Sequence, residues 1–236
     1  MRVYRYCAWD GSQDEFRLDP DDALDALSAL LMEGLSLRAA LDAMAEHGFA
    51  LAGRELRVLG RQDLLRALRD EARALERRYH LRAATESIRR RLDALLDLEQ
   101  TAVRARHGHE SARHNDFMAR RHAEPAEPGE PLSGLLDRFR DWAFEDATAG
   151  EAFAELLAEL ERLRALERFR HARGERFRGP EPAGYETAQE IRERLEALSA
   201  LAQALADGDL PSVDSEALRA LLGSEAADSL ILLRDL

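Results

Sequence analysis

Leucine and alanine recur at every third or fourth position along most of the chain, and charged residues fill the positions between them. This spacing matches the turn of about 3.6 residues in an α-helix, so each such segment has one apolar face and one polar face. The pattern predicts helices over approximately 20–33, 37–47, 61–79, 85–106, 148–173, 187–207, 215–222 and 224–236, with a shorter amphipathic piece at 135–142. Before them, the weak alternation of 2–9 predicts an extended arm, and no strand is expected after it. We therefore expect an all-α fold, a multi-helix bundle of amphipathic helices with a short extended N-terminal arm.

Residues with capping chemistry stand at several of the expected helix ends. Ser36 is expected to cap the second helix, and Pro20 to occupy the first position of the first helix. Two capping boxes, each a hydroxyl followed three residues later by a carboxylate, predict long helices that start near Thr148 and Thr187. The glycines expected to end helices are Gly34, Gly48, Gly208 and Gly223.

One segment interrupts the helical pattern. Residues 107–131 are rich in His, Arg, Glu and Pro, and the three prolines Pro125, Pro128 and Pro131 are evenly spaced. Such a composition is typical of a mobile linker or a frayed helix end. We therefore expect an N-terminal helical domain over 1–106, a linker over 107–131 and a C-terminal helical domain over 132–236, with one continuous bundle as the alternative.

The composition agrees with helices and excludes some chemistry. Hydrophobic residues make up 45% of the chain but aromatic residues only 6%, so the β-branched and aromatic types that strands favour are scarce. All the basic residues are arginines, which excludes the lysine that a P-loop places on phosphate and the amine that Schiff-base catalysis needs. The net charge of -12 argues against a general nucleic-acid binder, because a polyanion would be repelled.

Cysteine usage and hydropathy indicate the compartment. Cys7 is the single cysteine, so it has no intramolecular disulfide partner, and we expect it to be a small buried side chain. The first ten residues lack the apolar core of a secretion signal, and no stretch approaches the ~20 apolar residues that span a bilayer. We expect a cytoplasmic protein without membrane insertion.

The residues with ligand chemistry gather in the interrupted segment. His107, His109, Glu110 and His114 are the candidate metal ligands, and His122 follows them. Glu110 and His114 would share a helix face, yet the spacing matches no known zinc arrangement. Solvent-exposed histidines are the preferred interpretation, and a metal site and a pH-responsive element are the alternatives.

Arginines also gather in the middle of the chain, where nucleic acid could be bound. Stacking aromatics are absent there, so we prefer a solvated helix face whose arginines pair with acidic neighbours in this or another protein. The arginines in question are Arg89, Arg90, Arg91, Arg104, Arg106, Arg113, Arg120 and Arg121.

Aromatic residues are the candidates for a protein interface, since they dominate binding hot spots, although such residues more often belong to a core. The candidate interaction residues are Trp9, Asp10, Phe139, Trp142 and Phe144. The oxygen-rich run from Asp10 to Asp14 fits neither an EF-hand nor a D-x-S-x-S metal motif, so a turn is expected. No nucleophile, general acid or phosphate loop forms a recognisable motif, so we assign no catalytic residue and no cofactor.

Three segments resemble the N-terminal helical region of bacterial von Willebrand factor A (VWA) proteins associated with MoxR-type AAA+ ATPases. Residues 6–14, Tyr-Cys-Ala-Trp-Asp-Gly-Ser-Gln-Asp, are similar to that family's Y-S-x-W-D-G-T-Q start and precede a leucine-rich hairpin that ends at His47. Residues 139–144 resemble a recurrent L-x-D-Y-x-F stretch, and 213–223 resemble a third family segment. The VWA domain itself and its metal motif do not occur in this sequence, so no metal-dependent role is carried over to any residue. The resemblance implies a helical module, either part of a longer VWA protein or a stand-alone relative.

We therefore expect a non-enzymatic helical interaction or adaptor module whose protein partner is a AAA+ ATPase or a VWA protein. The alternative is a DNA-associated regulator that uses 215–236 as a helix-turn-helix-like segment. Glu216, Glu225, Asp228 and Asp235 argue against a basic recognition face there. A metal-dependent enzyme built on 107–122 ranks last.

Overall fold

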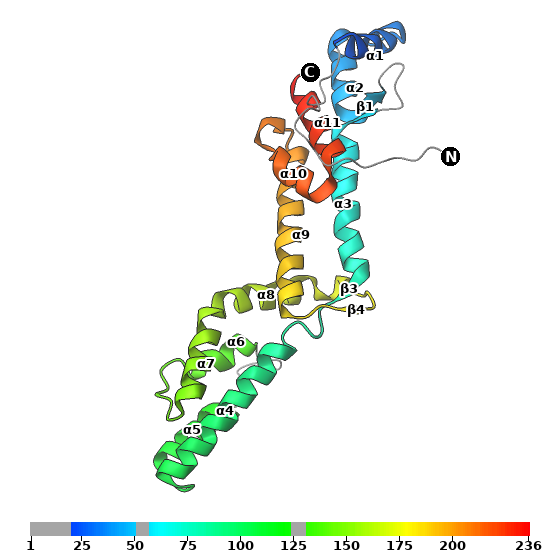
Figure 1. Ribbon diagram of the computed structural model, residues 1–236. Helices are drawn as coiled ribbons and strands as arrows, with labels where there is room; N and C mark the ends of the chain where they lie inside the picture. Colours follow the sequence, from blue (N-terminus) through cyan, green and yellow to red (C-terminus); the bar gives the residue numbers. More distant parts are fainter. Residues whose placement is uncertain (1–19, 51–56, 124–130) are drawn as a thin grey trace, which may run out of the picture. The chain divides into compact units, whose positions relative to one another are not determined.

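The computed structural model describes residues 20–50, 57–123 and 131–236 (Figure 1). These residues form eleven α-helices and two sheets of two short strands each. The all-α fold class is confirmed, with amphipathic helices that bury their apolar faces against one another. The expected N-terminal arm lies outside the described residues, as do Cys7, Trp9 and Asp10.

The chain divides into two compact units that do not follow the expected boundaries. The first unit takes 1–72 and 196–236, and the second takes 73–195. The division therefore falls within two long helices, α3 (Arg61–Arg78) and α9 (Tyr185–Ala206), and the whole of 107–131 belongs to the second unit. The expected linker was inferred from local composition, whereas the units are defined by contacts between segments distant in sequence.

The first unit is built from both ends of the chain. Besides the adjoining parts of α3 and α9, it contains α1 (Pro20–Met32), α2 (Leu37–His47), β1 (Gly48–Ala50), β2 (Arg57–Leu59), the 3-10 turn η2 (Leu210–Ser212), α10 (Ser215–Leu222) and α11 (Ser224–Arg234). Ser36 caps α2 as expected, because its hydroxyl accepts a hydrogen bond from the Ala39 amide at 3.3 Å. The core combines both chain segments through Met44, Val58, Leu64, Leu68, Leu205, Leu218 and Leu230.

A two-stranded sheet joins α2 to α3, which corrects the expectation that no strand follows the arm. β1 and β2 pair in antiparallel fashion, with Gly48 opposite Leu59. Gly48 has φ +70°, and a Cβ there would lie 2.1 Å from the carbonyl oxygen of Val58, so only glycine fits. The Leu59 amide donates to the hydroxyl of Ser229 at 3.0 Å, which connects β2 to α11. Strands of three residues are too short to give a detectable alternation in the sequence.

The second unit is one continuous segment of the chain. Besides its parts of α3 and α9, it contains β3 (Tyr79–His80), α4 (Glu86–His107), α5 (Ala112–His122), α6 (Leu132–Arg138), α7 (Ala147–Ala158), α8 (Leu160–Arg173), the 3-10 turn η1 (Gly174–Arg176) and β4 (Glu181–Pro182). α4 contacts both α5 and α7, and α6 contacts α8. The strands β3 and β4 pair in parallel, with Tyr79 opposite Glu181.

The helix α5 corrects the expectation of a mobile linker. Ser111 caps it by accepting a hydrogen bond from the His114 amide at 3.1 Å, and Phe117 is fully buried. The Phe117 ring packs against Phe139 and Trp142, and burying a Phe side chain contributes about 1.5–3 kcal/mol, so this ring stabilises the otherwise polar helix. Pro125 and Pro128 lie outside the described residues.

Two expected helix starts are also corrected. α7 begins two residues earlier than the capping box at Thr148, because the Asp146 carboxylate accepts from the Ala149 amide at 2.8 Å. α9 begins at Tyr185, so Thr187 lies inside the helix. The long helix expected after Thr148 is divided at Glu159 into α7 and α8. Among the described helices, none combines the length and apolarity needed to cross a bilayer.

Candidate functional site

Two of the expected interface aromatics lie in the core of the second unit. Phe139 is fully buried and Trp142 is 6% exposed. Their rings pack with Phe117, at centroid distances of 5.4 Å from Phe117 to Phe139 and 5.5 Å from Phe117 to Trp142. Phe144 is partly buried, with its ring 4.8 Å from that of Phe153. Phe139 and Trp142 therefore stabilise the fold and offer no surface to a partner.

A buried carboxylate that the sequence analysis did not single out organises this cluster. Glu99 on α4 is fully buried and accepts a hydrogen bond from the Trp142 indole nitrogen at 2.8 Å. The same carboxylate accepts from the backbone amides of Glu145 and Asp146 at 2.9–3.0 Å. These amides precede α7, where a negative charge also interacts favourably with the helix dipole. Both oxygens of the Glu99 carboxylate thus accept hydrogen bonds, and they lie next to the N-terminus of α7.

Six of the eight central arginines pair with acidic or carbonyl groups of the described residues, whereas Arg89 and Arg104 do not. Arg121 bonds the Asp97 carboxylate at 2.6 Å, and Arg120 bonds that of Asp141 at 2.7 Å. Arg113 stacks on the Trp142 ring with its guanidinium carbon 3.6 Å from the ring centroid. Glu145 accepts hydrogen bonds from His107 and Arg106, which hold its pKa below the usual value. Within the described residues, these arginines therefore hold α4, α5 and the start of α7 together.

The histidines of the expected metal cluster do not converge. His107 bonds the Glu145 carboxylate at 3.1 Å, whereas the rings of His109 and His114 contact each other at a centroid distance of 4.9 Å. Glu110 and His122 are exposed. In 20–50, 57–123 and 131–236, no group of three or more His, Cys, Asp or Glu side chains is arranged to hold a metal ion.

The first unit carries a groove lined by leucines, which we name the leucine groove. It has a volume of about 360 Å³ and is lined by Leu37, Leu41, Leu233 and Leu236, together with Arg38, Asp42 and Ala45. Leu37 is 56% exposed, although the helical spacing predicted that Leu37, Leu41 and Met44 would form one core stripe. Of these three only Met44 is fully buried, so the outer part of the stripe is left to solvent.

More apolar side chains are exposed in the same unit. Met32, the last residue of α1, is 90% exposed, Leu24 is 55% exposed, and Ile231 on α11 is 40% exposed. None of these three side chains lines the leucine groove, and single exposed apolar side chains are ordinary.

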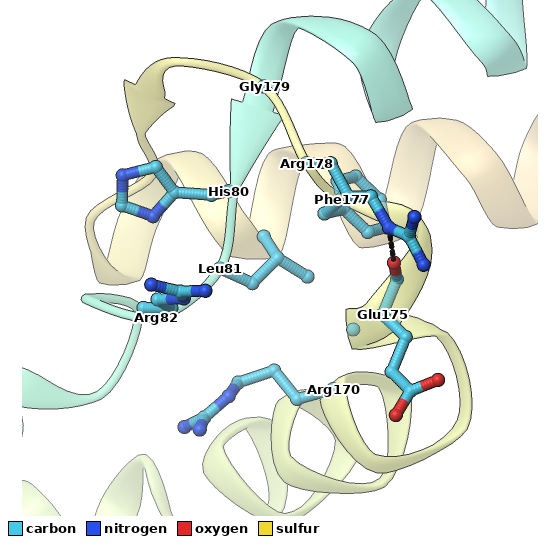
Figure 2. Close-up of a pocket in the computed structure, with 9 residues that line it drawn as sticks. His80, Leu81, Arg82, Arg170, Glu175, Phe177, Arg178 and Gly179 are labelled. Carbon is cyan, nitrogen blue, oxygen red and sulfur yellow. Dashed lines mark hydrogen bonds between the residues drawn. The ribbon is translucent and has the colours of Figure 1, made fainter.

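The second unit carries a different concavity, which we name the basic pocket. It is about 810 Å³ in volume and lies among the residues after β3, the end of α8 and the loop that leads to β4 (Figure 2). Its lining residues are His80, Leu81, Arg82, Arg170, Gly174, Glu175, Phe177, Arg178 and Gly179. These residues come from two stretches of sequence about ninety positions apart, and no motif connects them, so sequence reasoning did not find them.

The helix pair α10–α11 does not present a basic face. Arg219 pairs with Glu216 and Asp228, both at 3.3 Å. Arg234 donates to the backbone carbonyls of Leu210 and Val213. Both arginines of the pair are thus engaged within the chain, which does not favour the DNA-binding alternative.

The comparisons with known proteins bring no further identification of either concavity. The chain matches no protein-family model, no curated protein and no solved structure.

Proposed function

We propose that the chain is a non-enzymatic helical interaction module that docks a protein partner through the leucine groove. The observation that carries the proposal is the exposure of Leu37 at 56% beside Leu41, Leu233 and Leu236 in one groove. Leu37 is 56% exposed and Leu236 is 37% exposed. Burying an exposed leucine side chain contributes about 1.5–3 kcal/mol, so a partner that fills the groove gains affinity chiefly from these two side chains.

The partner that we propose is a MoxR-type AAA+ ATPase or a VWA protein. Support comes from the resemblance of 6–14, 139–144 and 213–223 to the helical region of VWA proteins. An apolar helix of the partner would fit the groove, because α2 and α11 leave an apolar strip between them, as in other helix-in-groove complexes.

The test compares two leucine substitutions on exposed helix surfaces. Leu37→Asp places a charge in the groove, whereas Leu98→Asp places one on α4, where Leu98 is 49% exposed. Position 37 is the first residue of α2, where an acidic side chain is favourable, so Leu37→Asp should leave the fold stable. Affinity for a AAA+ ATPase and a VWA protein from the same genome would be measured by isothermal titration calorimetry.

We expect Leu37→Asp to weaken binding about tenfold or more, which corresponds to about 1.4 kcal/mol, while Leu98→Asp binds like the unchanged chain. If neither protein binds at tens of micromolar, the proposed partners are wrong. If a partner binds but both substitutions act equally, docking does not use the leucine groove.

A further inference from the structure

The basic pocket has an excess of positive charge in a chain that is acidic as a whole. Arg82, Arg170 and Arg178 line it, and Glu175 is the single acidic residue among the lining residues. Figure 2 shows the carboxylate of Glu175 directed away from the guanidinium of Arg170. The chain as a whole has 46 acidic residues and 34 arginines, so acidic residues outnumber basic ones. In the lining of the pocket the ratio is reversed, with three arginines and one glutamate.

None of these three guanidiniums is neutralised by a carboxylate of the described residues. Arg170 donates to the hydroxyl of Thr85 at 2.7 Å, and Arg178 donates to the backbone carbonyl of Glu175 at 2.9 Å, and both acceptors are uncharged. Arg82 is exposed and has no hydrogen bond or ion pair in the described part of the chain. The three like charges therefore repel one another, and an anion among them would relieve the repulsion.

Two carboxylates close to the pocket in sequence pair with arginines that do not line it. Glu181 bonds Arg78 at 2.9 Å, and Glu76 lies 3.8 Å from Arg176. The Nδ1 atom of His80 is also buried without a hydrogen-bond partner in the segments that the structure describes. The guanidiniums of Arg82, Arg170 and Arg178 therefore remain available to an anionic ligand.

The floor of the pocket is apolar. Leu81 and Phe177 are each 4% exposed, and Figure 2 shows Leu81 between Arg82 and Arg178, with Phe177 beside Arg178. Phe177 is held in place by edge-on packing with Phe169, at a centroid distance of 5.8 Å. Small-molecule sites usually combine an apolar lining with a few polar groups in a volume of about 300–1,000 Å³, a range that includes this pocket.

We propose that the basic pocket binds a small organic phosphate. The phosphate group would lie against Arg82 and Arg170, because the guanidinium fork matches phosphate oxygens and two cations balance a dianion. The apolar part of the ligand would lie on Leu81 and Phe177. This site is in the second unit and does not depend on the leucine groove.

The experiment uses the full chain and four simple probes, which are phenyl phosphate, inorganic phosphate, benzoate and phenol. Binding is measured by calorimetry and by the shift of the thermal midpoint. We expect phenyl phosphate to bind most tightly, at a dissociation constant of about 1 mM or below, and to raise the midpoint more than the other three. Equal binding of benzoate would overturn the preference for phosphate, and a lack of protection by phenyl phosphate would overturn the site.

Two substitutions locate the binding. Arg82→Gln should weaken phenyl phosphate binding about tenfold without lowering the thermal midpoint of the free protein, because Arg82 has no partner in the described residues to lose. Arg168 is an exposed arginine on the same helix as Arg170, but it does not line the pocket. Arg168→Gln should therefore leave phenyl phosphate binding unchanged. Equal weakening by both substitutions would mean that phosphate is held by the general surface charge, and the proposal would fail.

Discussion

At the scale of single residues, the buried carboxylate of Glu99 connects α4 to the Trp142 ring and to the start of α7. It receives hydrogen bonds from the Trp142 indole and from two backbone amides at the start of α7. A buried carboxylate is stable only when such partners surround it, and an amide in its place leaves the donors at one of its two oxygens without an acceptor.

We predict that Glu99→Gln lowers the free energy of unfolding by about 2–4 kcal/mol, because an amide nitrogen would then face a backbone amide. Urea denaturation followed by circular dichroism measures the change. Glu151→Gln, an exposed position on α7, is the matched control and should stay within about 0.5 kcal/mol of the unchanged chain. A loss for Glu99→Gln as small as that of the control would mean that the carboxylate does not organise this cluster.

Sequence reasoning at this scale identified the right residue types but not their surroundings. Phe139 and Trp142 were candidates for an interface, with a core position as the alternative, and the structure places both in the core. Glu99 was not singled out, because a glutamate in a Glu- and Arg-rich helix gives no local sign of burial. Its partners lie more than forty positions away, and only the fold brings them together.

At the scale of helices and strands, boundaries marked by local chemistry were predicted well. Ser36, Gly48 and Gly223 lie where the caps of α2 and α10 were expected. Not every such boundary was predicted, because the Asp146 side chain caps α7 ahead of the capping box at Thr148 and α9 begins before Thr187. The helix α5, which depends on the burial of Phe117, forms where composition indicated a linker. The two concavities were missed for a related reason, since each combines side chains from elements distant in sequence.

The junction of α2, α3 and α9 within the first unit depends on Arg61. Its guanidinium bonds Glu46 at 2.7 Å and donates to the carbonyls of Leu205 and Ala206 at the end of α9. The hydrogen bond from Arg61 holds the pKa of Glu46 below its ordinary value of 4.5, although partial burial opposes this effect. The ion pair therefore stabilises the fold fully above pH 4.5, and this contribution is lost as the pH falls through the lower pKa of the folded state.

We predict that Glu46→Gln destabilises the protein at neutral pH and that the difference from the unchanged chain shrinks as the pH is lowered below 4.5. Thermal unfolding of both proteins at a series of pH values measures the difference. Glu33→Gln, at an exposed position in the same unit, is the control and should give a small difference at every pH. A pH-independent difference for Glu46→Gln would contradict the assigned role of the ion pair.

At the scale of the whole molecule, the chain order differs from the order in space. The first unit joins 1–72 to 196–236. The Leu59 amide donates to Ser229, which is 170 positions away, and Arg61 donates to Leu205, which is 144 positions away. No linker, glycine run or change of composition marks the division, which falls inside α3 and α9. A boundary of this kind follows from long-range contacts alone, so a pass along the sequence could not predict it.

This organisation predicts that residues 73–195 fold without the rest of the chain. The segment keeps Glu99, Phe117 and Trp142 with the helices that hold them, so we expect cooperative unfolding with a free energy of about 5 kcal/mol. Trp142 is its single tryptophan, so blue-shifted emission that moves to the red in urea reports the burial of this ring. Residues 1–72 alone should be largely unfolded, because β2 and α3 lose the hydrogen bonds that they donate to 196–236. If instead 73–195 unfolds gradually with solvent-exposed tryptophan emission, its core depends on the first unit and the two units do not fold independently.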